Sequence, residues 1–245
     1  MSFLVVSCTS DHGFLPDEES SELFSSKEWQ APLENVFDLS KINDHVAASK
    51  LYDAIDVLKW SLIGNEVLQY LTDAFGHGMG GVIIKIDPSA FANAPTGAQA
   101  KFVRPNIIVF RDPYTINSQT FIEEVLHIIQ NHANQDRGGI DTSVSNFEYE
   151  VKVVSDILLM ADQNALGKLG YPYFPVGDLS NSKQQVNLDY SKWIANIANR
   201  GFTTQDDRDT FYRFLDQWEH PDYSGSAFPS RNYTLYLLIN FLRQK

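Results

Sequence analysis

Apolar residues recur at helical spacing along most of the chain. Side chains three or four positions apart share one face of a helix, and this spacing is clear over residues 40–62 and 65–75. The same pattern predicts further helices over residues 120–134, 146–166, 183–199, 204–218 and 229–243. The chain is therefore expected to be rich in helix.

Two short runs of β-branched residues precede the helix predicted at 120–134. GVIIKID (81–87) and NIIVF (106–110) have the composition of strands. The glycines of GHGMGG (76–81) permit backbone angles that other residues resist, and the prolines of GYPYFPVGD (170–178) exclude regular structure there. This order predicts an α+β fold: a helix-rich domain with a small β-sheet before the helix at 120–134.

Composition supports a packed domain and excludes one class of partner. Hydrophobic residues make up 43% of the 245 residues and aromatic residues 13%, which is enough for a single domain over residues 31–245. The net charge of -12 opposes binding to a phosphate backbone, so nucleic acid is not an expected partner. No run approaches the roughly 20 apolar residues of a transmembrane span.

The only cysteine, Cys8, excludes an internal disulfide and a cysteine-based zinc site. Leu4, Val5, Val6 and Ser7 lead into it, and this run resembles the end of a bacterial lipoprotein signal. The basic start and the longer apolar run of a signal peptide are missing. Two interpretations stay open: a lipid anchor at Cys8 in the cell envelope, with residues 1–30 as an acidic tether, or a frayed apolar N-terminus.

One arc of the helix at 120–134 is entirely polar. At 3.6 residues per turn it carries Glu123, Glu124, His127, Gln130, Asn131 and Asn134. A solvated face usually includes cations, yet no Lys or Arg occurs between Arg111 and Arg137. The arc therefore favours a cleft or a metal site, with an ordinary solvated face as the alternative.

The following helix carries two informative carboxylates. Ser145 and Glu148 have the spacing of a capping box, which gives Glu148 a structural role. Glu150 instead shares a face with Val153, Val154 and Ile157. A carboxylate among apolar side chains must be hydrogen-bonded, paired or bound to a metal. Glu150 is thus either a metal ligand or a buried partner of an Arg or Tyr.

The run TFIEEVLHIIQ (120–130) and the glutamate about twenty residues later resemble the gluzincin branch of zincin metallopeptidases, over roughly residues 80–165. The resemblance implies a zinc ion held by Glu123, His127 and Glu150, with Glu124 as the general base. It also implies that NIIVF is the edge strand that aligns an extended peptide or protein substrate. The oligomeric state is not indicated.

The motif departs from the family at its first ligand, because Glu123 stands where zincins have histidine. Two carboxylates leave a bound zinc ion a poorer Lewis acid, and they suit Mn²⁺ or Fe²⁺ better. Three interpretations remain: a divergent metallopeptidase, a non-catalytic envelope protein that binds partners on the same scaffold without metal, and a helical domain unrelated to zincins. Di-iron bundles need a second Glu-x-x-His, which the sequence lacks.

The other histidines give weaker evidence for a functional site. His132 lies on the apolar side of its helix and is expected to be a core histidine. His77 has no partner nearby in sequence, and His220 is expected to end a helix, where its charge suits the helix dipole.

Overall fold

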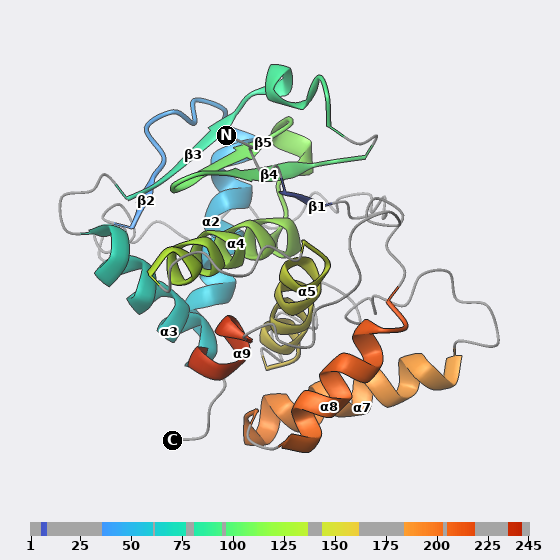
Figure 1. Ribbon diagram of the computed structural model, residues 1–245. Helices are drawn as coiled ribbons and strands as arrows, with labels where there is room; N and C mark the ends of the chain where they lie inside the picture. Colours follow the sequence, from blue (N-terminus) through green and yellow to red (C-terminus); the bar gives the residue numbers. More distant parts are fainter. Residues whose placement is uncertain are drawn as a thin grey trace, which may run out of the picture.

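A mixed β-sheet lies against a group of helices in the computed structural model (Figure 1). The structure describes residues 6–8, 36–60, 62–76, 81–94, 97–136, 144–161, 184–202, 205–218 and 235–241. The predicted loop at 170–178, His77, His220 and the part of the predicted tether beyond Cys8 lie outside these residues. No described helix is long and apolar enough to cross a membrane.

The sheet has the strand order β1-β4-β5-β3-β2. Its strands are β1 (Val6–Cys8), β2 (Phe37–Asp38), β3 (Val82–Ile86), β4 (Ala100–Val103) and β5 (Ile107–Phe110). Strands β2, β3 and β5 are parallel, β4 is antiparallel to β5, and β1 is antiparallel to β4. Gly81 enters β3 with φ of 66°, an angle that glycine adopts without steric cost.

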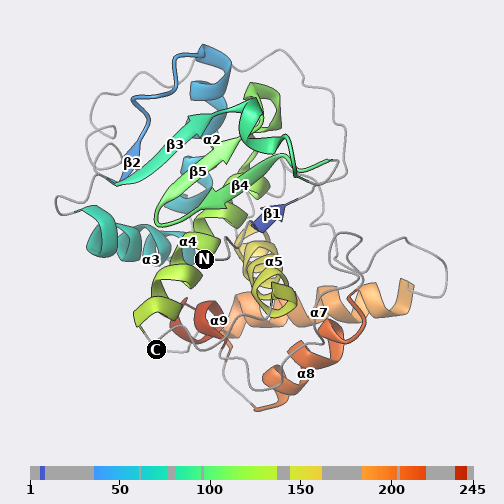
Figure 2. The same ribbon diagram turned by 45° about the horizontal axis from the view of Figure 1, so that its top comes forward.

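Alternation along the strands separates the two faces of the sheet. Ile84, Ile108 and Phe102 pair across three strands and belong to the main core. The neighbouring Val109 and Ile107 point to the other face, where they join a small cluster around Phe91 in the 3₁₀ turn η3 (Pro88–Phe91). The helices cover the face that carries Ile108 (Figure 2).

Helix α4 (Ser118–Asp136) runs under the sheet and carries the predicted motif. The side chain of Asn117 accepts a hydrogen bond from the Thr120 amide at 2.9 Å and so caps the first turn. Phe121 packs against Phe37 of β2, with ring centroids 5.4 Å apart. Helix α4 also contacts β4, α2 (His45–Trp60), α5 (Val144–Ala161) and α9 (Tyr236–Phe241), so nearly every side of it is covered.

The remaining helices pack around α4 and its neighbours. Helix α3 (Leu62–Leu71) continues into a π-helical turn, η2 (Thr72–Gly76), and packs on α2. Helices α7 (Gln184–Arg200) and α8 (Gln205–Leu215) lie on the side of α5 away from α3 (Figure 1). Aromatic rings from α5, α7 and α8 stack there: Tyr149, Tyr190, Trp193, Phe211 and Phe214.

The predicted α+β fold, mostly helical with a small sheet before the motif helix, is confirmed. The edge-strand prediction for NIIVF is wrong, because β5 pairs with β3 on one side and β4 on the other. The sequence did not predict β1, β2 and β4, since these strands have only two to four residues. Residues 6–8 of the predicted tether form β1.

Candidate functional site between helices α4 and α5

The polar arc of α4 is buried. Glu124 and Gln130 are 0% exposed, and His127 is 2% exposed. Glu123, Asn131 and Asn134 are also buried. The solvated-face alternative is therefore wrong, and the absence of Lys and Arg from this arc was the informative signal.

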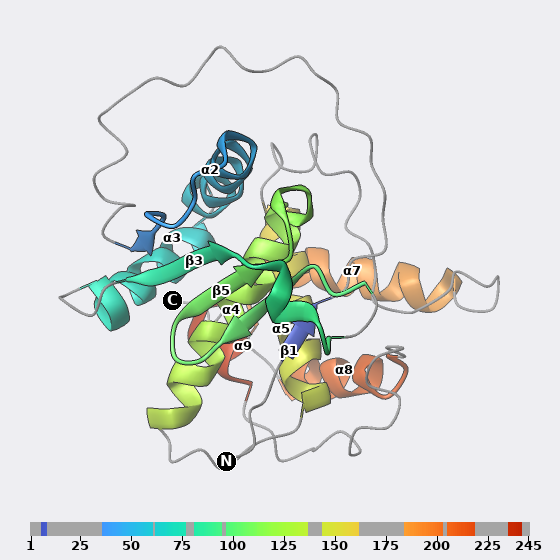
Figure 3. The ribbon, with the colours of Figure 1, turned by 90° about the horizontal axis from the view of Figure 1, so that it is seen from above.

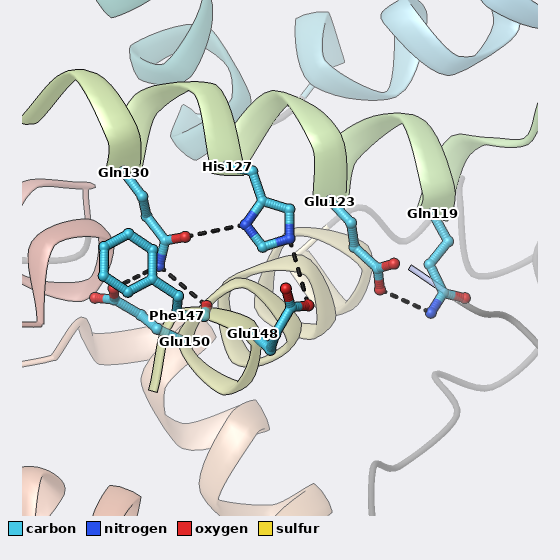
Figure 4. Close-up of polar contacts among 7 residues, drawn as sticks. All are labelled: Gln119, Glu123, His127, Gln130, Phe147, Glu148 and Glu150. Carbon is cyan, nitrogen blue, oxygen red and sulfur yellow. Dashed lines mark hydrogen bonds and ion pairs between the residues drawn. The ribbon is translucent and has the colours of Figure 1, made fainter. Parts of the chain in front are cut away.

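His127 is held from both sides of its ring (Figure 4). Its Nε2 lies 3.5 Å from Oε2 of Glu148, a buried residue of α5. Its Nδ1 lies 3.2 Å from Oε1 of Gln130, one turn further along α4. The imidazole and the carboxylate thus meet across the helix interface, and both side chains are buried.

Gln130 has a fixed orientation, because its amide nitrogen donates to two acceptors. One is the Phe147 carbonyl at 3.1 Å and the other is Oε2 of Glu150 at 3.0 Å. The oxygen of the Gln130 amide must therefore face His127, and Nδ1 must be the donor. Nε2 therefore faces Glu148. This nitrogen carries a proton when the ring is an imidazolium and a lone pair when the ring is neutral.

The pKa of His127 is raised from 6.5 to about 9. Burial acts in the opposite direction and is the largest single influence, because it disfavours the charged imidazolium. The charge and hydrogen bond of Glu148, the charge of Glu124 and the hydrogen bond to Gln130 together outweigh burial. Without a metal, the ring is a cation at neutral pH.

Glu148 and not Glu150 faces Nε2 of His127. The carboxylate of Glu150 lies beyond Gln130 in Figure 4 and accepts hydrogen bonds at Oε1 from the Leu237 and Leu238 amides, at 2.8 and 3.2 Å. These amides belong to the first turn of α9, where donors lack intrahelical partners. Glu150 therefore anchors α9, and its predicted role as a metal ligand stays a prediction.

The sequence predicts a capping role for Glu148. Helix α5 begins at Val144, so Ser145 already lies inside it, and the carboxylate of Glu148 points across to α4. Oε1 of Glu148 is buried and accepts no hydrogen bond from any residue that the structure describes. A buried carboxylate oxygen in this state is a position suited to a cation.

Glu123 lies one turn before His127. It points into the same buried polar layer between α4 and α5, which also holds His127 and Glu148 (Figure 4). Its Oε1 accepts a hydrogen bond from Gln119 Nε2 at 3.1 Å. Burial raises the pKa of Glu123, while the charge of Lys152 on α5 opposes that shift. Lys152 in turn pairs with Asp156 one turn later.

Asp156 lies in the same polar layer, toward the C-terminal end of α5. It is fully buried, pairs with Lys152 and accepts a hydrogen bond from the Tyr190 hydroxyl at 2.8 Å. Burial raises the pKa of Asp156. Glu148, Lys152 and Asp156 stand four residues apart, so α5 presents them as one stripe. This spacing was readable in the sequence and was missed.

Glu124 is fully buried beside His127, and its charge helps to raise the histidine pKa. The structure thus brings Glu123, Glu124 and His127 together, adds Glu148, and places Glu150 elsewhere in the same polar layer. Within the described residues, no three His, Cys, Asp or Glu side chains are already grouped to hold a metal ion. His127 Nε2 and the carboxylate of Glu148 lie 3.5 Å apart, and Glu123 lies one turn before His127 on α4.

His132 lies on the apolar side of α4, as the sequence predicts, but it is only partly buried. Its Nδ1 lies 2.9 Å from the Tyr70 hydroxyl, and its ring packs edge-on against Phe75, with centroids 5.2 Å apart. Tyr70 belongs to α3 and Phe75 to the π-helical turn that follows it.

Comparison with known proteins gives no assignment. No protein-family model matches the chain, and no curated protein or solved structure matches it.

Proposed function

We propose that the protein is a divergent zincin-like metallopeptidase. The observation that carries the proposal is the buried meeting of His127 Nε2 with Glu148 across α4 and α5, with Glu124 beside them. The motif helix lies directly under a sheet whose β4 is antiparallel to its neighbour. The outer edge of β4 already pairs with β1, so the proposal rests on the polar site below the sheet and not on a strand edge that aligns substrate.

The donor set fits a divalent ion in its chemistry. Nε2 of His127 and the carboxylates of Glu148 and Glu123 would hold it, and Glu148 replaces Glu150 in this assignment. Oε1 of Glu148, which no described residue satisfies, is the structural reason for preferring it. One nitrogen and two carboxylate donors suit Mn²⁺ or Fe²⁺ as well as Zn²⁺. When bound, the ion supplies a Lewis acid that polarises a peptide carbonyl and makes water a better nucleophile.

The protein side chains supply orientation and proton transfer. Gln130 fixes the tautomer of His127 through Nδ1, so that Nε2 can donate its lone pair. The carboxylate of Glu124 accepts a proton from the attacking water and passes it to the leaving amine. Lys152 places a positive charge near Glu123, which offsets the extra carboxylate that this chain has in place of a histidine.

We further propose that the protein acts in the bacterial cell envelope, anchored by lipid at Cys8. The run from Leu4 to Ser7 supports this, as does the acidic segment that follows Cys8. Signal cleavage before Cys8 would remove Val6 and Ser7, and with them most of β1. Mass spectrometry of the protein from a bacterial membrane fraction tests the anchor directly.

Peptide cleavage after metal loading tests the enzymatic proposal. The full chain is supplied separately with Zn²⁺, Mn²⁺ and Fe²⁺ and incubated with a mixed peptide library, and new termini are identified by mass spectrometry. Glu124→Gln should keep the metal and lose cleavage by at least 10²-fold, the usual scale for a general base. The matched control is Asp209→Asn, which removes an exposed carboxylate on α8.

Cleavage that is equal in wild type and Glu124→Gln would contradict the assigned base. Metal binding without any cleavage would favour the second candidate, a non-catalytic binding protein on this scaffold. The closed set of hydrogen bonds around Gln130 gives that candidate some support, because it orders His127 without a metal.

A further inference from the structure

Lys152 places an ammonium group in the polar layer between α4 and α5. It comes one turn after Glu148 and shares that face of α5. Its side chain is 15% exposed and forms an ion pair with the fully buried carboxylate of Asp156. The layer therefore already contains a cation that belongs to the chain itself.

The ammonium acts on carboxylates from two helices. Burial raises the pKa of Glu123 on α4, and the charge of Lys152 is the strongest influence that lowers it. The charge of Asp156 raises the pKa of Glu123 further, so these two carboxylates repel each other. Helix α5 lies between α4 and α7 and contacts both (Figure 3). Lys152 thus balances, in part, two carboxylates that face each other within the helical layer.

Both carboxylates are also held by groups other than Lys152. Oδ2 of Asp156 accepts a hydrogen bond from the Tyr190 hydroxyl at 2.8 Å. Oε1 of Glu123 accepts one from the Gln119 amide at 3.1 Å. Lys152 binds the other oxygen of Asp156, Oδ1. A change at Lys152 therefore leaves both carboxylates oriented and alters the cation that they face.

We propose that Lys152 is a built-in cation that competes with a divalent ion for the carboxylate of Glu123, and so sets the divalent-ion affinity of the layer. The inference rests on the proposed function for the place of the ion, beside His127 and Glu148, and it adds how that site is regulated. The ion binds when its free concentration is high enough to displace the ammonium from Glu123.

The chemistry of lysine suits this exchange. Its long, flexible stem lets the ammonium move toward water while the methylene groups stay packed, and the side chain already reaches the surface in part. A divalent ion and an ammonium next to the same buried carboxylate repel each other strongly, because few water molecules screen them. The two cations therefore exclude each other at Glu123.

Mn²⁺ binding to the full chain tests the competition. Mn²⁺ suits carboxylate oxygens, and electron paramagnetic resonance distinguishes its free and bound forms. Lys152→Met removes the charge and keeps an apolar stem, whereas Lys152→Arg keeps the charge. Lys192→Met is the matched control, because it removes an exposed lysine of α7. Lys152→Met should bind Mn²⁺ roughly tenfold more tightly than wild type or better, the scale on which one neighbouring charge affects an ionisable group.

The two other variants should bind Mn²⁺ as wild type does. A role of Lys152 in folding alone would not tighten ion binding, and rescue by arginine assigns the effect to the charge. Equal affinity in wild type and Lys152→Met would overturn the proposal while leaving the metal site of the proposed function in place. Mn²⁺ binding by Lys152→Met and not by wild type would support the competition and reject a resident metal in the peptidase.

A Glu123→Gln background locates the competition. Lys152→Met should lose most of its gain there, because the contested carboxylate is gone and the two residues are coupled. A gain of the same size in both backgrounds would indicate general charge repulsion and would overturn competition for Glu123.

Circular dichroism covers the case in which Lys152→Met does not fold without added ions. Mn²⁺ should then refold it, and NaCl of the same ionic strength should not, because a bound ion replaces the missing charge. A variant that stays unfolded with Mn²⁺ would overturn the proposal.

Discussion

His127 and Glu148 meet across two helices, with Nε2 and Oε2 3.5 Å apart and both side chains buried. Neither residue is near the other in sequence, and the turn-by-turn spacing of α4 and α5 brings them together. This pair is the centre of a layer in which carboxylates outnumber cations. Buried charges without a balance are unfavourable, and a resident cation is one way to provide that balance.

The pH dependence of folding should report the imidazolium of His127 in the metal-free protein. Its pKa rises from 6.5 to about 9 on folding. Because the folded value is the higher one, the stabilisation is complete below pH 6.5 and is lost as the pH rises to about 9. We expect His127→Gln to reduce the free energy of unfolding more at pH 6 than at pH 9.5, by at most about 3 kcal/mol. Urea denaturation at the two pH values measures this.

A His127 penalty that is the same at both pH values would contradict that account. Imidazole NMR gives an independent check, since the pKa of His127 should be well above 6.5, at about 9.

Glu123→Gln should stabilise the metal-free protein at neutral pH. Burial raises the pKa of Glu123, so ionisation of this carboxyl disfavours the folded state above its unfolded pKa. The amide can still accept the hydrogen bond from Gln119. We expect a gain of about 1 kcal/mol at pH 8. The gain should shrink as the pH falls and be absent well below pH 4.5, the ordinary pKa of this carboxyl, where the wild-type group is neutral in both states. Thermal unfolding across this pH range tests it, and a loss of stability at pH 8 would show that Glu123 is structurally required.

Glu150→Gln should weaken the attachment of α9. Its two oxygens accept from Gln130 Nε2 and from the amides of Leu237 and Leu238. A glutamine replaces one of these oxygens with an NH₂ group, so at least one of the buried N–H groups that now bind Glu150 loses its acceptor. The expected loss is about 1 to 3 kcal/mol, with faster hydrogen exchange at Leu237 and Leu238. Exchange in α9 that does not change would show that the helix is held by its apolar contacts alone.

Some of the site was predictable because it lies within one helix. The spacing of Glu123, Glu124 and His127 follows from helical geometry alone, and the missing cations marked their face as buried. The choice between Glu148 and Glu150 depends on how α5 is rotated against α4. Residues two positions apart on a helix differ by about 200° in direction, so an error of about half a turn in the assumed rotation exchanges the proposed ligand for the anchor of α9.

The sheet was less predictable for a related reason. NIIVF has the composition of a strand at any position, and its central place is decided by the pairing of β4 with β5. Strand β4 lies close to turn residues and is four residues long. Strand β1 is fixed by an edge that only the folded protein provides.

Metal content tests the central claim most directly. Wild type, Glu148→Gln and Glu150→Gln are dialysed, resupplied with Zn²⁺, Mn²⁺ or Fe²⁺ and analysed by mass spectrometry for bound metal. We predict roughly one ion per chain in wild type and Glu150→Gln, and loss of that ion in Glu148→Gln. Metal that survives Glu148→Gln but disappears in Glu150→Gln would contradict the assignment of Glu148, and no metal in the wild type would contradict the metal site altogether.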